Sequence, residues 1–207
     1  MSDERPVVPG EENPKRQQIL DGARQMFLSK GFEGASMQDI ASAAKVSKGT
    51  LYVYFDNKET MFEALVTEEC SRLQETVRRI GTGTGSVEQE LREIARQMLE
   101  TLLRPQILAA IRVMIGAGEK FPELARKIYE AGPARSATTI GDYLQLRAAR
   151  GDLHVENCAA AGSLFVDMVL TGLQRRALLM MPPLAPAALE DYLATRVALF
   201  VAGHAPR

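Results

Sequence analysis

The stretch SMQDIASAAKVSKGTLYVYFDNK, residues 36–58, decides how the N-terminal part of this 207-residue chain folds. Ser36 and Ser47 are of a residue type that caps helix N-termini, and each is followed by a short apolar run at helical spacing. Only Lys45 and Val46 separate the first run from the second cap, so the connection is a tight turn. The stretch therefore predicts two short helices joined by a turn, with a long third helix starting at its end.

Two helices joined in this way form a helix-turn-helix when small residues lie at their crossing and an apolar residue fills the turn. Ala41 and Ala44 are the small residues of the first helix, and Val46 is the apolar residue of the turn. Leu51 and Phe55 are four residues apart, so both are expected to face the core. The second helix of such a motif enters the major groove of DNA, which is about 12 Å wide. The pattern therefore predicts a DNA-binding module.

The first candidate DNA contacts lie at the start of the second helix. Ser47, Lys48, Gly49 and Thr50 form its N-terminal turn, from which side chains reach bases and phosphates. Gly49 has low helix propensity, which makes sense if the backbone must approach DNA closely. The alternative is that Gly49 is simply a glycine at an ordinary helix start.

Further candidates lie downstream. A hydroxyl on Tyr52 or Tyr54 suits a phosphate oxygen and the ring suits a thymine methyl, although either tyrosine can instead pack against the first helix. Val53 either touches a thymine methyl or fills a gap. Lys58 begins the long helix, where free N–H groups and the positive dipole end favour a phosphate; the alternative is a solvated surface lysine.

Helical spacing continues through the rest of the chain, and no strand alternation is evident. The sequence therefore predicts an all-α protein of about nine helices, after a disordered tail over residues 1–13 that is rich in Pro, Gly and acids. Gly31 is expected to end the first helix, residues 81–86 are expected to form a flexible link, and Gly132-Pro133 is expected to interrupt the seventh helix. The expected helices are 14–30, 37–44, 48–55, 58–80, 87–103, 105–116, 122–149, 155–181 and 187–202.

Composition and charge narrow the function classes. Hydrophobic residues make up 46% and charged residues 25%, with a net charge of −1, as in an ordinary soluble domain. Residues 14–58 carry seven bases and four acids, so a locally basic module stands on a near-neutral body. Two cysteines far apart predict reduced thiols in a cytoplasmic protein, and the polar start predicts no secretion signal.

Catalytic and membrane signals are weak. The two histidines, the lack of Cys-His metal spacing and the lack of a phosphate-binding glycine loop or nucleophile elbow argue against an enzyme, a metal site or a cofactor. The longest apolar run, 158–173, contains Asp167, so no membrane span is predicted. The other alternative to DNA binding is a helical adaptor that binds protein and uses the motif only for packing.

KVSKGTLYVYFDNKETMFEAL (45–65), preceded by GFEGASMQDIASAA (31–44), resembles the DNA-binding domain of TetR-type transcriptional regulators. The match spans about residues 14–65, and GEKFPELARKIYEAGPAR (118–135) is similar to the ligand-binding half of the AcrR- and AefR-like branch. Val53 departs from the polar or aromatic residues frequent at its position, which leaves the base sequence read by this helix open. By position, the family's DNA contacts fall on Ser36, Met37, Ser47, Lys48, Gly49, Thr50, Tyr52, Val53, Tyr54 and Lys58.

The resemblance implies a helix-turn-helix domain over 14–60 and a ligand-binding and dimerisation domain over 61–207. It implies a homodimer that binds a palindromic operator in double-stranded DNA, and repression is expected because the family mostly represses. The expected interface is a four-helix bundle of Ala159–Met180 and Ala187–Ala202 from both partners, the alternative being that both helices are buried within one chain.

The resemblance also implies a ligand pocket among the middle helices of the second domain. Its apolar, Met-containing candidates favour a small hydrophobic or amphipathic effector, because methionine adapts to irregular shapes. The candidate ligand-binding residues are Met98, Leu102, Ile111, Met114, Phe121, Tyr129, Phe165 and Met168.

Overall fold

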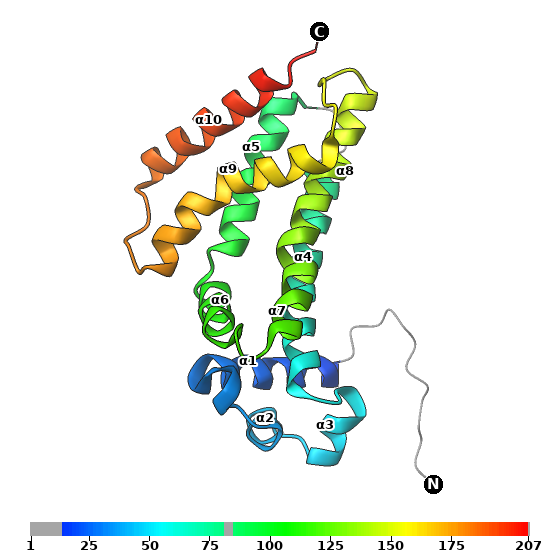
Figure 1. Cartoon of the computed structure of the whole chain (residues 1–207), viewed down its shortest axis with the longest axis vertical. Coiled ribbons are helices and arrows are strands. Elements are labelled where there is room, and N and C mark those ends of the chain that lie inside the picture. The colour runs from blue at the N-terminus through cyan, green and yellow to red at the C-terminus, as the bar shows by residue number, and fades with distance from the viewer. Residues whose placement is uncertain (1–13, 81–84, 207) are drawn as a thin grey trace. The chain divides into compact units, whose positions relative to one another are not determined.

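A computed structural model describes residues 14–80 and 85–206, and the described residues are helical without any strand, which confirms the all-α prediction (Figure 1). The predicted tail, 1–13, and most of the predicted link at 81–86 lie outside the described residues. The helices are α1 (Pro14–Gly34), α2 (Met37–Ala43), α3 (Lys48–Tyr54), α4 (Lys58–Ile80), α5 (Val87–Leu102), α6 (Pro105–Ala117), α7 (Pro122–Tyr129), a π-helical turn (Glu130–Ala134), α8 (Arg135–Ala149), α9 (Cys158–Leu178) and α10 (Pro186–Gly203). The chain divides into two compact units between Leu65 and Val66.

The first unit holds α1, α2, α3 and the start of α4 around a small aromatic core. Phe27, Phe32 and Phe62 pack with ring centroids 5.3–5.7 Å apart, in tilted and edge-to-face arrangements that suit aromatic rings. Ile19 and Leu20 on α1 are fully buried as well. Gly31 adopts φ 73°, so the first helix breaks where the sequence predicts its end.

The second unit is a helical bundle with one large apolar core. Leu73 and Val77 on α4, Ile94 and Met98 on α5, and residues of α8, α9 and α10 contribute to this core. Within it Phe165 and Phe200 meet edge to face at 5.0 Å between ring centroids. The core therefore ties the long apolar helices α9 and α10 to the middle of the bundle by one face each.

Helices α8 and α9 approach each other closely because glycines lie at their crossing. A Cβ placed on Gly141 would lie 3.0 Å from the Cys158 carbonyl oxygen. A Cβ on Gly162 would collide with the Ala137 carbonyl oxygen and with the backbone of Gly141. The small residues at 159–163 thus serve at least in part to pack α9 onto α8 within one chain.

The predicted interruption at Gly132-Pro133 is confirmed. The π-helical turn Glu130–Ala134 joins α7 to α8 and contains Pro133, whose missing N–H removes one hydrogen bond of the helical ladder. One predicted helix, 122–149, is therefore three consecutive helical segments in the structure.

Two boundaries of α9 differ from the prediction. The helix starts at Cys158 rather than near 155, because the side chain of Asn157 accepts a hydrogen bond from the Ala160 N–H and so caps it. It ends at Leu178 rather than at Met181, because Met180 adopts φ 60° and leaves the helical conformation. Both corrections come from caps that the apolar pattern does not show.

Candidate nucleic-acid interface

The start of α2 is fixed by a reciprocal cap. The Ser36 hydroxyl accepts a hydrogen bond from the Asp39 N–H at 3.1 Å, and the Asp39 carboxylate accepts one from the Ser36 N–H at 3.1 Å. Lys30 donates to the same carboxylate at 2.8 Å, and its ion pair, with the Ser36 hydrogen bonds, lowers the pKa of Asp39 to about 2. The capping box predicted for these two residues is confirmed, and it holds Ser36 and Met37 at the surface end of α2.

The turn between α2 and α3 follows a defined hydrogen-bond pattern. The Lys45 N–H donates to the Ser42 carbonyl at 3.1 Å, and the Val46 N–H donates to the Ala41 carbonyl at 3.0 Å. These are the two bonds of a Schellman motif, which needs the residue directly after the helix C-cap in the left-handed region. Lys45 takes that conformation, with φ 53°, and its side chain is exposed.

Helix α1 braces this turn from behind. A Cβ on Gly22 would lie 2.7 Å from the Ala44 backbone nitrogen, so only glycine fits at the crossing of α1 and α2. The Gln18 side-chain amide donates to the Ala44 carbonyl at 2.6 Å. Helix α1 therefore contacts the turn at both the nitrogen and the carbonyl oxygen of Ala44. Ala44 is itself buried, as the sequence predicts.

Helix α3 presents one exposed face and one buried face. The Ser47 hydroxyl accepts from the Thr50 N–H at 3.0 Å and lies 2.7 Å from the Thr50 hydroxyl, which confirms the predicted cap. Leu51 is fully buried and Phe55 is 6% exposed, so both face the core as predicted. The opposite side of α3 carries the exposed residues of the helix.

The exposed face combines aromatic, cationic and polar groups. Tyr52 is 45% exposed and Val53 is 79% exposed. The Lys48 ammonium lies 5.9 Å from the centroid of the Tyr52 ring, close enough for a cation–π contact. Ser47, Lys48 and Gly49 are exposed as well, whereas Thr50 and Tyr54 are half-buried.

Lys58 points toward the end of α1. Its ammonium donates to the carbonyl oxygens of Phe32, Glu33 and Ala35 at 2.8, 3.3 and 3.4 Å, and it lies 4.7 Å from the centroid of the Phe32 ring. All three protons of the ammonium therefore have acceptors inside the first unit. The N-terminus of α4 is capped separately, because the Asn57 side chain accepts from the Thr60 N–H at 2.8 Å.

The eight predicted ligand-binding residues occupy different environments in the second unit. Met98 and Phe165 are fully buried in the main core, Leu102 and Met168 pack against it, and Met114 is 9% exposed. Ile111 and Phe121 are half-buried, whereas Tyr129 is 62% exposed.

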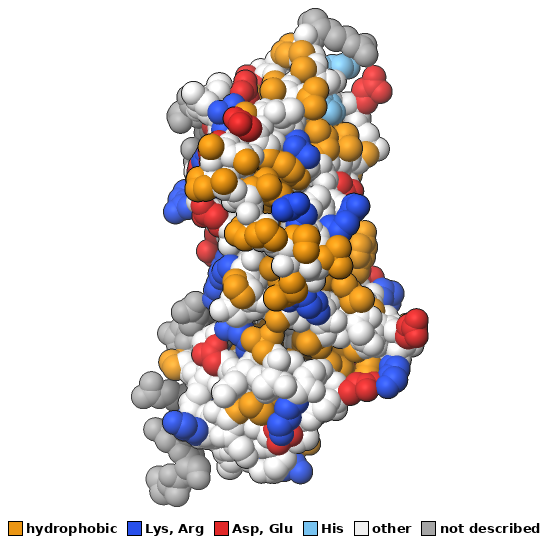
Figure 2. Space-filling model, turned by 90° about the vertical axis from the view of Figure 1, so that its left-hand side faces the viewer, with side chains coloured by type: hydrophobic (Ala, Val, Ile, Leu, Met, Phe, Trp, Pro, Cys, Tyr) orange, Lys and Arg blue, Asp and Glu red, His pale blue; other side chains and the backbone are white. Residues whose placement is uncertain are grey.

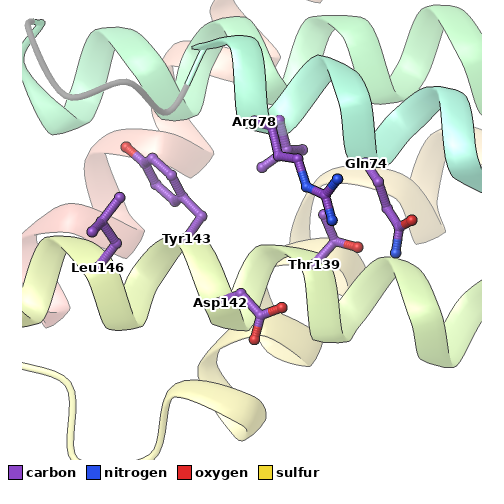
Figure 3. Close-up of a pocket in the computed structure, with 7 residues that line it drawn as sticks. Gln74, Arg78, Thr139, Asp142, Tyr143 and Leu146 are labelled. Carbon is purple, nitrogen blue, oxygen red and sulfur yellow. The ribbon is translucent and has the colours of Figure 1, made fainter.

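A cavity of about 250 Å³ lies elsewhere, between α4 and α8 (Figure 3). Gln74 and Arg78 reach from α4 toward Thr139 on α8, and Asp142 and Tyr143 lie along the same helix. None of the eight predicted residues lines this cavity, whose walls combine polar side chains with Val77 and Leu146.

Helices α9 and α10 each keep a second apolar face outside the core. Leu164 on α9 is 50% exposed and Leu199 on α10 is 62% exposed, and the small residues Ala159, Ala160, Thr195 and Ala198 are exposed as well. Figure 2 shows apolar side chains spread over one face of the molecule, interrupted by lysines and arginines. The two helices thus have the exposed small and apolar residues that a helix–helix contact requires.

Family models match both units of the chain. A model described as bacterial regulatory proteins of the tetR family matches residues 19–65, and one described as the C-terminal domain of AefR-like transcriptional repressors matches residues 89–206. The second match alone covers more than half of the chain. The chain belongs to the TetR family. Members of this family are DNA-binding transcriptional regulators and not enzymes.

Individual TetR-family relatives support the assignment. The flavonoid-responsive regulator FrrA has a TM-score of 0.78 and is 32% identical, covering 94% of this chain and 98% of its own. A Mesorhizobium loti protein assigned to the TetR-family regulators has a TM-score of 0.82 at 28% identity, covering 93% and 97%. The transcriptional repressor AcnR of Corynebacterium efficiens is 39% identical over 85 residues, which is 41% of this chain and 40% of AcnR. The chain thus matches well under half the length of that curated relative.

Sequence reasoning missed three residues of the TetR-type module. Gly22 and Gln18 act across the α1–α2 crossing, and no local pattern marks a contact between residues more than 20 positions apart. Lys45 was expected only as part of a join. Its position directly after a capped helix, where glycine is usual, was the available signal for a left-handed residue.

Proposed function

We propose that the chain is a ligand-responsive repressor that binds a palindromic operator as a homodimer. One observation supports this best: α3 exposes Ser47, Lys48, Gly49, Tyr52 and Val53 on a helix whose other face is locked into the core. Such a rigid, polar and aromatic surface suits a major groove, where phosphate contacts fix the position and base contacts select the sequence. Ser36, Met37, Thr50 and Tyr54 complete the proposed contact surface. We infer that the protein acts on DNA in the cytoplasm.

The test is a gel shift with duplex DNA from upstream of the protein's own coding sequence. We expect a retarded complex whose affinity falls steeply with salt, because phosphate neutralisation releases counterions. Tyr52→Ala is expected to cost about 1–3 kcal/mol of operator binding and leave dimerisation intact. A chain that binds no duplex even at low salt would contradict the proposal.

The proposed homodimer uses the exposed faces of α9 and α10 in a four-helix bundle. These faces carry Leu164 and Leu199 together with exposed alanines, which allow helices to approach closely. A twofold dimer places the two recognition helices about 34 Å apart, or a multiple of this, so each half-site is read by one helix. Leu164→Arg with Leu199→Arg is expected to yield monomers by sedimentation, with tight operator binding lost as a result.

The proposed effector is a small hydrophobic or amphipathic molecule that binds in the second unit. The related regulator FrrA is named as flavonoid-responsive, so a flavonoid is a suitable first probe. Helix α4 starts in the first unit and continues into the second, which makes it the proposed carrier of the response. Release requires the ligand to bind the free protein more tightly than the DNA-bound protein, with a coupling of about 1–3 kcal/mol. Equal affinity for both forms would contradict the mechanism.

A further inference from the structure

Three helices of the chain end in the same backbone turn. After α2, α8 and α9, one N–H donates to the carbonyl three residues back and the next N–H donates to the carbonyl five residues back. In each turn the first of the two donors is left-handed: Lys45 at φ 53°, Gly151 at φ 79° and Met180 at φ 60°. The three turns therefore allow the residue at one backbone position to be compared within a single protein.

Glycine is the residue that fits this position without strain, because any Cβ crowds the neighbouring carbonyl oxygen. Gly151 follows that rule, and a Cβ at this site would have open space around it. A side chain retained at the same position strains the backbone. We therefore expect Lys45 and Met180 each to make a contact that compensates for this strain.

Met180 makes such a contact within the protein. Its sulfur lies 3.1 Å from the Arg112 guanidinium, which also donates to the Ala177 and Leu178 carbonyls at the end of α9. The side chain thus takes part in a contact that holds α6 to the C-terminus of α9.

Lys45 has no such internal contact. Across residues 14–80 and 85–206, its side chain makes no hydrogen bond, ion pair or ring contact, and it is exposed. The carboxylate of Asp39, on α2, is engaged by Lys30. The Lys45 ammonium is therefore a solvated charge on a strained backbone, immediately before the cap of α3.

We propose that Lys45 contacts a phosphate of the DNA duplex, beside the bases that α3 reads. The assignment rests on the proposed function, since it needs α3 to enter the groove. Lys45 lies two residues before Ser47, so their Cα atoms are at most about 7.6 Å apart. The flexible four-carbon stem gives the ammonium the reach to a phosphate on the rim of the groove, where a point charge is sufficient. The phosphate contact then explains why a charged side chain occupies a strained backbone position.

The experiment compares Lys45→Gly, Lys45→Met and Lys45→Arg on the full chain with a random-sequence duplex and with the operator. Loss of one phosphate contact reduces the slope of log K against log salt by about 0.9 for each protomer, or about 1.8 for a dimer. At 0.1 M salt this corresponds to about eightfold weaker binding per protomer. Arg79→Gln, which removes an exposed charge from the second unit, is the control and is expected to leave the slope unchanged.

Stability gives an independent readout. Lys45→Gly is expected to raise Tm by a few degrees while weakening DNA binding, because it relieves the backbone and removes the charge. Lys45→Met is expected to weaken binding to the same extent without the gain in Tm, and Lys45→Arg is expected to keep the slope. Opposite signs for stability and binding in one variant are the signature of this role.

The outcomes separate two failures. A wild-type chain that binds no duplex at low salt contradicts the proposed function and the Lys45 contact with it. Wild-type binding with an unchanged salt slope in both Lys45→Gly and Lys45→Met overturns the Lys45 contact alone.

Discussion

Two sets of cationic side chains, one in each unit of the chain, lie in opposite environments. In the first unit, Lys45 and Lys48 lie exposed at the start of the recognition helix. In the second, Arg147 is 3% exposed, forms ion pairs with Glu90 and Asp152 at 2.8 and 2.7 Å, and donates to the Gly85 carbonyl at 2.7 Å. The same class of residue is thus exposed in one set, as the proposed DNA contact requires, and joins helices internally in the other. A net-charge count cannot separate these roles, but burial and hydrogen bonding do.

The largest effect is expected from breaking the internal use of charge. Arg147→Met leaves the carboxylate of Glu90, itself 6% exposed, without its cation. Removing one partner of a buried pair costs about 3–5 kcal/mol, because the other charge stays buried. We expect a loss of this size in the free energy of unfolding of the second unit, measured by urea denaturation.

A double variant sharpens this result. Glu90→Gln combined with Arg147→Met removes both charges, and the Tyr143 hydroxyl, 2.9 Å from Glu90, retains an acceptor. We expect the double variant to recover part of the stability that Arg147→Met loses. If Arg147→Met alone costs less than about 1 kcal/mol, the pair is not an internal tie.

The second effect concerns packing behind the proposed DNA-binding surface. Gly22→Ala brings a Cβ within 2.7–2.9 Å of Ala44 backbone atoms, so α1 and α2 must separate. Overpacking of this kind costs about 1–3 kcal/mol, and we expect a lower Tm together with weaker operator binding. Gly34→Ala is the matched control, because its Cβ would make only an ordinary contact, 3.5 Å from the Lys30 Cβ. Equal effects of the two variants would contradict the crossing as the cause.

The features that the sequence predicts correctly are mainly those that depend on interactions between residues close together in the chain. The caps at Ser36 and Ser47 and the break at Gly132-Pro133 depend on a few adjacent residues, and all are present as predicted. Gly22 depends on a partner in another helix, which no local pattern reveals. The end of α9 was placed too late because Met180 carries no turn signal of its own.

The candidate site divides along the same line. The buried and exposed faces of α3 follow from helical spacing, so Leu51 and Tyr52 lie where the pattern places them. A ligand pocket depends instead on the space that the side chains of several packed helices leave between them. The candidates in the helices where the family resemblance implies a pocket include Phe165, which is fully buried in the core, and Tyr129, which is 62% exposed.

A smaller effect is expected from substitution of Lys58. This substitution tests whether the lysine acts through hydrogen bonds within the first unit or through a phosphate contact. Lys58→Met keeps the stem beside Phe32 and removes the donor to three carbonyls at the end of α1. We expect a loss of about 1–2 kcal/mol in the free energy of unfolding, because those part-buried acceptors lose their partner. We expect the salt slope of DNA binding to stay constant, because all three protons are already donated within the unit. A slope reduced by about 0.9 per protomer would instead support the phosphate contact that the sequence predicts.

The smallest effect is a dependence on pH in the first unit. Lys30 and Ser36 hold the pKa of Asp39 at about 2, below its usual value of 3.8. The unfolded chain therefore takes up a proton at this carboxyl before the folded chain does, so the stability that Asp39 contributes is complete above about pH 4 and is lost as the pH falls through 2. The Tm of the wild type is expected to fall more steeply with decreasing pH in that window than the Tm of Asp39→Asn. The variant has no titrating group at this cap. Parallel curves would mean that the capping box and its lysine do not stabilise the start of α2 through charge.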